Sequence, residues 1–148
     1  MRQLLAALLI LFFMILPGCF FISQRGNYSL YQSFDQIERI EIVEVIDGTD
    51  DSNLIMKSVS VLDKEAHQNI VNQILKAEGN YVLEGAVFEL GTYVVRITYN
   101  SGAVELIGKW SYRHISEDGQ ILPGCYWFDD GQFYSIISQY VESIVLPE

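Results

Sequence analysis

Basic residues are scarce in this chain, which has 9 lysines and arginines against 19 aspartates and glutamates among its 148 residues. Its formal net charge at pH 7 is therefore −10. Nucleic-acid binding requires clustered lysine and arginine that displace the counterions of the phosphate backbone. The sequence contains no such cluster, so its composition argues against a nucleic-acid partner. An anionic lipid surface would also repel so acidic a chain.

Cysteine and histidine are also rare, with two residues of each kind. His67 and His114 lie far apart and match no zinc-ligand spacing, so we predict neither a metal site nor a cofactor. The two cysteines could form at most one disulfide, between Cys19 and Cys125. If Cys19 is modified, Cys125 stands alone, and its aromatic neighbours favour a buried thiol over a nucleophile activated by His114.

Motifs of established catalytic mechanisms are missing as well. There is no Gly-x-Ser-x-Gly elbow and no glycine-rich phosphate loop. The segment 47–53 (DGTDDSN) places oxygen-bearing side chains at alternate positions, as calcium loops do. Such a loop needs a carboxylate at its twelfth position, where this chain has Ser58. We therefore interpret the segment as a solvated turn.

The longest apolar stretch lies at the N-terminus. Arg2 precedes Leu4–Leu16, a run of apolar residues without a charge (LLAALLILFFMIL). Its length is typical of the hydrophobic region of a secretory signal and short for a membrane span. The residues that close it, Leu16-Pro17-Gly18-Cys19, resemble the lipobox of bacterial lipoprotein precursors.

This resemblance implies how the chain is processed and located. In that family the chain is cut before the cysteine, which then carries the lipid, so residues 1–18 would be a signal peptide and Cys19 the lipidation site. Stable attachment to the membrane requires more than one acyl chain. The alternative of an uncleaved single-pass anchor is retained, because apolar residues continue to Ile22. Ordinary secretion is the third alternative, and all three place the domain outside the cytoplasm.

The rest of the chain predicts a tether followed by one domain. Residues 19–33 are predicted to form the lipidated N-terminus and a short tether. The tether is predicted because the residues after Ile22 are mostly polar. Residues 34–148 predict a single domain, since a chain of this length can bury a sizeable core. The segment Tyr81–Leu90 is ambiguous between an irregular strand and a loop.

Strands are predicted from alternation and β-branched content. Asn100-Ser101-Gly102 predicts a hairpin turn, and Pro123-Gly124 predicts that the last strand lies at a sheet edge. The predicted strands cover residues 37–46, 54–62, 92–99, 103–107 and 109–115, with a last one after the turn at 116–119.

Two helices follow from apolar stripes at helical spacing. The first begins after Asp63, which is placed as its N-cap. The second is predicted to open at Asp129, with Gln132 completing a capping box and Phe128 and Phe133 at the hydrophobic-staple positions. The fold class is therefore α+β: a two-layer domain in which two helices pack on one face of an antiparallel sheet of about five strands.

Trp110 and Tyr112 are the candidate ligand-binding residues, because aromatic side chains are enriched where proteins bind peptides or sugars. The alternative is that both fill the core between sheet and helices. We expect a membrane-anchored extracytoplasmic lipoprotein with a non-catalytic domain that binds another protein. Two alternatives stay open: a small envelope hydrolase built on His114 with two carboxylates, and a domain that binds a small ligand between sheet and helices.

Overall fold

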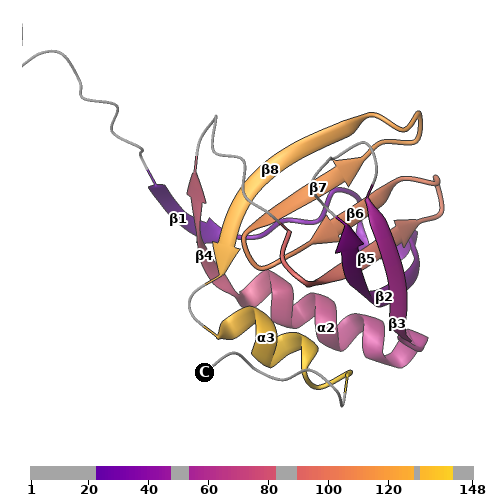
Figure 1. Ribbon diagram of the computed structural model, residues 1–148, viewed down its shortest axis with the longest axis horizontal. Helices are drawn as coiled ribbons and strands as arrows, with labels where there is room; N and C mark the ends of the chain where they lie inside the picture. Colours follow the sequence, from indigo (N-terminus) through magenta and orange to yellow (C-terminus); the bar gives the residue numbers. More distant parts are fainter. Residues whose placement is uncertain (1–22, 48–53, 83–89, 129–130, 142–148) are drawn as a thin grey trace, which may run out of the picture.

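The structure is a computed structural model, and it describes residues 23–47, 54–82, 90–128 and 131–141. Within these ranges the chain forms eight strands, two α-helices and one 3-10 turn (Figure 1). The strands are β1 (Ser23–Asn27), β2 (Ile37–Asp47), β3 (Ile55–Val61), β4 (Glu78–Val82), β5 (Tyr93–Tyr99), β6 (Val104–Ile107), β7 (Ser111–Ile115) and β8 (Ile121–Phe128). The helical elements are η1 (Phe34–Gln36), α2 (Lys64–Lys76) and α3 (Gln132–Ile137).

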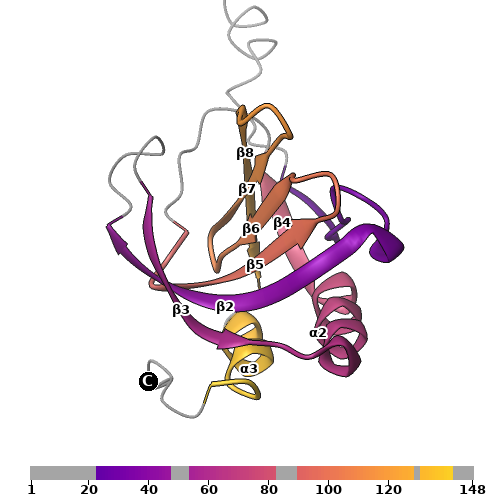
Figure 2. The same cartoon turned by 90° about the vertical axis from the view of Figure 1, so that its right-hand side faces the viewer.

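Six strands form the main antiparallel sheet, in the order β8-β7-β6-β5-β2-β3. A second, small sheet in the order β1-β4-β8 shares β8 with it, so the eight strands are continuous. Strand β8 makes this possible because it pairs with β7 along its first half and with β4 along its second. The sheet curls around the core, and both helices lie on the same side of it (Figures 1 and 2).

The main core joins the sheet to both helices. From the sheet it takes Ile40, Ile42, Val95 and Ile97, all fully buried. The helices contribute Ile70, Val71 and Ile74 from α2 and Phe133, Ile136 and Ile137 from α3. A smaller cluster of Val43, Leu90, Val94 and Leu106 lies on the opposite face. Since Val94 and Val95 are both buried, the central strand β5 has two covered faces.

The α+β class, the antiparallel sheet and the two helices are confirmed, but the predicted number of strands is wrong. The main sheet has six strands where about five were predicted, and β1 and β4, which pair with each other over five residues, form the second, small sheet with β8. Strand β1 falls within the predicted tether, so this part of the chain is ordered. Strand β4 follows α2 after a single residue, Ala77. Residues 83–89 of the ambiguous segment lie outside the described ranges.

Helix α2 begins as predicted. The side chain of Asp63 accepts a hydrogen bond from the backbone N–H of Ala66 at 2.8 Å, which satisfies one of the donors left free at a helix start. Glu65 lies in the first turn and Lys76 in the last, the favourable arrangement for the helix dipole. Within the described ranges, α2 and α3 both lack the length and apolarity that crossing a membrane requires.

Helix α3 begins later than predicted. Its N-cap is Gly131, with φ +75° and no side-chain cap, and the predicted capping box of Asp129 and Gln132 depends on a residue outside the described ranges. A left-handed φ is accessible to glycine without strain, and that places the helix start at Gly131. The staple contact itself exists, because the rings of Phe128 and Phe133 lie 5.3 Å apart. Asp129 and residues 142–148 lie outside the described ranges.

The turn between β6 and β7 depends on Gly108. Its backbone N–H donates to the carbonyl of Ser111 at 2.9 Å, and the next residue, Lys109, donates to the carbonyl of Leu90 at 3.1 Å. A Cβ at Gly108 would lie 2.0 Å from the carbonyl oxygen of Leu90. Only a glycine lets these two backbone segments approach so closely.

The Gly108→Ala substitution is therefore expected to lower the free energy of unfolding by about 2–3 kcal/mol, the cost of overpacking against rigid backbone. Urea denaturation of the full-length protein in mild detergent measures this change. Gly26→Ala is the matched control, since a Cβ there meets no atom within 4 Å. Equal stability of the two variants would contradict the proposed close approach.

Candidate functional site

The most unusual residue in the described core is Glu105, a carboxyl side chain with no exposed surface. It lies on β6 between Val104 and Leu106, and the alternation of the strand turns it to the same side as Ala103 and Ile107. Removing a carboxyl group from water costs several kcal/mol unless hydrogen-bond donors replace the water. The surroundings of Glu105 must therefore supply those donors.

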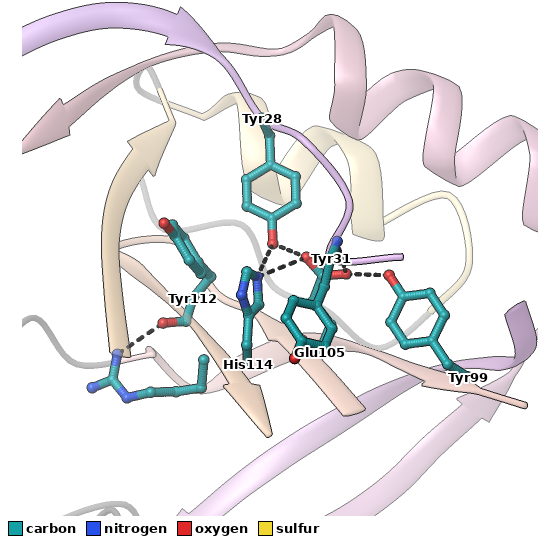
Figure 3. Close-up of polar contacts among 7 residues, drawn as sticks. Tyr28, Tyr31, Tyr99, Glu105, Tyr112 and His114 are labelled. Carbon is teal, nitrogen blue, oxygen red and sulfur yellow. Dashed lines mark hydrogen bonds and ion pairs between the residues drawn. The ribbon is translucent and has the colours of Figure 1, made fainter. Parts of the chain in front are cut away.

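Four groups surround the two carboxyl oxygens (Figure 3). The hydroxyl of Tyr28 donates to Oε1, and Nε2 of His114 lies 3.2 Å from the same oxygen. The hydroxyl of Tyr99 and, at 3.3 Å, the backbone N–H of Tyr31 donate to Oε2. We call these five residues the Glu105 cluster. Both oxygens are fully engaged, so the carboxyl group is stably held inside the fold.

The cluster joins parts of the chain that are distant in sequence. Glu105 and His114 face each other across β6 and β7, and Tyr99 comes from the end of β5. Tyr28 and Tyr31 come from the segment after β1, which crosses this face of the sheet (Figure 3). Burial raises the pKa of Tyr99 to about 12. This hydroxyl therefore keeps its proton, and remains a donor, throughout the physiological pH range.

Aromatic rings enclose His114. Its ring lies 4.7 Å from that of Tyr31 and 4.9 Å from that of Tyr112, measured between centroids. Tyr28 meets Tyr112 edge to face at 5.3 Å. His114 retains 18% of its side-chain exposure, whereas Glu105 has none. The pair thus lies beneath a cover of tyrosines.

The two predicted ligand-binding residues have different surroundings. The Tyr112 ring packs over the β8 backbone at Gly124, where an added Cβ would lie 2.0 Å from the ring. Together with its contacts to Tyr28 and His114, this makes Tyr112 a part of the core. Trp110 is 36% exposed, and the ammonium group of Lys109 lies 4.0 Å from its ring centroid. Trp110 is thus a surface residue with a cation–π partner.

A second candidate surface follows the outer edge of the main sheet. Strand β3 ends the sheet, and its side chains Ile55, Val59 and Val61 are 54%, 37% and 55% exposed. Ile46 on the adjacent β2 is 62% exposed. We call these four residues the β3 edge patch. Edge strands carry unpaired backbone groups, so an apolar edge of this kind is a recognised place for another chain to bind.

Sequence reasoning missed Glu105 and Tyr28. A signal for Glu105 was present, because in Ala103–Ile107 (AVELI) the period of two places the glutamate on the inward face between two apolar residues. Nothing local identified Tyr28, whose role depends on a partner 77 residues away. The side chain of Cys125 and residues 48–53 of the calcium-like segment lie outside the described ranges. Across those ranges no three His, Cys, Asp or Glu side chains gather as a metal site.

The fold and the site together define a small α+β domain with a buried polar cluster and an apolar sheet edge. No protein-family model, curated protein or solved structure matches the chain significantly.

Tyr28→Phe removes one hydroxyl from the Glu105 cluster and leaves a buried carboxyl oxygen short of a donor. The free energy of unfolding is expected to fall by about 1–2 kcal/mol. Tyr93→Phe is the matched control, because the Tyr93 hydroxyl has no hydrogen bond to any described residue. Urea denaturation of the two full-length variants measures the difference. Equal loss in both would show that the Tyr28 hydroxyl contributes nothing to stability.

Proposed function

We propose that this protein is a lipoprotein held on the extracytoplasmic face of the cell membrane, and that its domain binds another protein without catalysing a reaction. The lipid anchor follows from the resemblance of Leu16–Cys19 to a lipobox, with Cys19 as the modified residue. The binding role follows from the surfaces and the buried groups of the domain.

The described titratable groups favour a structural use over catalysis. A hydrolase based on His114 would need a second carboxylate and access to substrate. His114 contacts the carboxyl group of Glu105, and Tyr28, Tyr31 and Tyr112 surround the pair. A general acid or base must reach the proton that it transfers. The enclosed position of Glu105 therefore supports the non-catalytic proposal over the hydrolase.

The observation that carries the binding role is the β3 edge patch. Isolated exposed apolar residues are normal, but here three β-branched side chains along one edge strand, and one on its neighbour β2, are exposed. Lys57 lies within β3, and the pairing with β2 passes over Val59 as a bulge. A lysine and a bulge on an edge strand oppose pairing with an identical edge. The patch thus favours a different protein, and the net charge of −10 favours one with a basic surface.

The anchor is tested by the mass of the mature protein. Protein extracted from membranes of a bacterial host is expected to begin at Cys19 and to carry acyl chains. Cys19→Ala is expected to abolish both the cleavage and the added mass, because no other side chain there can take the lipid. Cys125→Ala is the control and should be processed normally. An intact Met1 or Arg2 on the membrane-bound protein would instead show an uncleaved anchor.

Site-specific crosslinking tests the binding role. A photoreactive amino acid at Val59 of the full-length anchored protein is expected to give a covalent adduct with a second, different protein. The same amino acid at Gln68, exposed on α2, is the control and should give none. Ile55→Lys should reduce the adduct from Val59, since the charge disrupts the apolar patch. Adducts of equal yield from Val59 and Gln68, or none from Val59, would refute binding at this edge.

A further inference from the structure

The chain enters the folded domain almost immediately after the proposed lipid site. Only residues 20–22 separate Cys19 from Ser23, the first residue of β1. Strand β1 pairs with β4 along its whole length, from Ser23 opposite Val82 to Asn27 opposite Glu78. The four peptide links from Cys19 to Ser23 reach at most about 14 Å.

The segment 28–36 then fastens the start of the chain to the main sheet. Tyr28 and Tyr31 bind Glu105, as described above. Beyond them, Nε2 of Gln32 lies 3.0 Å from the hydroxyl of Ser101. The backbone N–H of Asn100 donates to the carbonyl of Gln36 at 2.8 Å. Contacts to two separate strands and one turn thus oppose detachment of this segment.

Detachment would change the reach of the anchor several-fold. If β1 and the 28–36 segment left the sheet, the first fixed residue would be Ile37. The chain from Cys19 to Ile37 could then extend to roughly 60 Å. The pairing of β1 with β4 and the contacts of the Glu105 cluster therefore together limit the distance between the domain and the lipid surface.

The strand register gives the domain an orientation as well. Asn27 lies opposite Glu78, next to the C-terminal end of α2, and β1 leads from there to Ser23, away from the helices. Strand β8 extends in the same direction, from Phe128 beside β4 toward Leu122 and the β7–β8 turn. In Figures 1 and 2 this turn lies at the top and both helices lie at the bottom. Figure 1 shows β1 at the left of the domain and above the helices, so the chain enters the domain on a side away from α2 and α3.

We propose that the Glu105 cluster holds the domain directly on the lipid headgroup surface, with the β7–β8 turn toward the membrane and α2 and α3 away from it. This inference rests on the proposed anchor. Leu122, 47% exposed on β8, lies on the membrane-facing end. The exposed acidic residues Glu117 and Asp118 at the same turn would be repelled by anionic lipid, so the proposed contact is with a zwitterionic surface.

Quenching by labelled lipid tests this arrangement. The mature protein, with its lipidation verified by mass, is placed in phosphatidylcholine vesicles that contain lipid with a headgroup nitroxide. A fluorescent amino acid replaces either Leu122 or, as the distal control, Gln68 on α2. We expect strong loss of fluorescence at position 122 and little at position 68.

Two variants separate the contribution of chain length from that of the cluster. An insert of about 16 glycine and serine residues between Ile22 and Ser23 adds roughly 22 Å of root-mean-square reach and leaves the fold unchanged. It should abolish the difference between positions 122 and 68. Glu105→Gln, checked by circular dichroism for a folded domain, should reduce the difference because it weakens the contacts to Tyr28 and Tyr31.

The possible failures are distinguishable. A protein without lipid and without membrane attachment would refute the proposed anchor. A lipidated protein that is quenched equally at positions 122 and 68 would leave the anchor standing and overturn the docked arrangement. A folded Glu105→Gln variant with an unchanged difference would show that the cluster does not hold the domain in place.

Discussion

The burial of one carboxyl group organises much of this structure. Glu105 lies at the centre of the sheet with no exposed surface, and a group of this kind is stable there only when donors replace its water. Strands β5 and β7 supply two of the donors, through Tyr99 and His114. The other two come from Tyr28 and Tyr31, outside the main sheet. The start of the chain is thereby bound to the centre of the fold.

This requirement explains why the domain begins earlier than its sequence indicates. Residues 23–33 are polar and carry no periodic apolar pattern, so local reasoning predicted a tether. Strand β1 exists because β4 pairs with it, and Tyr28 is buried because its hydroxyl donates a hydrogen bond to Glu105. Both partners lie more than 50 residues away in the chain. Pairings of this kind depend on the assembled fold and leave no signal in the segment itself.

Where the local pattern and the tertiary contacts agree, prediction succeeded. Strands β2, β3, β5 and β6 match their predicted ranges closely, because alternation and turn residues such as Gly102 specify them locally. The N-cap Asp63 is likewise local. The helix α3 begins later than predicted. Its N-cap is Gly131 in a left-handed conformation, and the sequence pattern around Asp129 gave no sign of this. Of the two candidate ligand residues, Tyr112 packs against the core. Its contacts with Gly124, Tyr28 and His114 show this, and none of them could be read from the sequence near Tyr112.

The two ends of the sheet have different physical characters, and this difference connects the proposed anchor with the proposed binding role. In the continuous strand order β1 and β3 are the two outermost strands. If Cys19 carries the proposed lipid, only a few residues join β1 to the anchor, and this end of the sheet would be held at the membrane. Strand β3 is separated from it by six intervening strands, which at about 4.8 Å each place the two edges far apart along the sheet. A protein that binds the apolar β3 edge therefore meets no obstruction from the anchored end. In the proposed anchored arrangement the same short connection would limit the height of this edge above the lipid, which would favour a partner that is itself at the membrane surface.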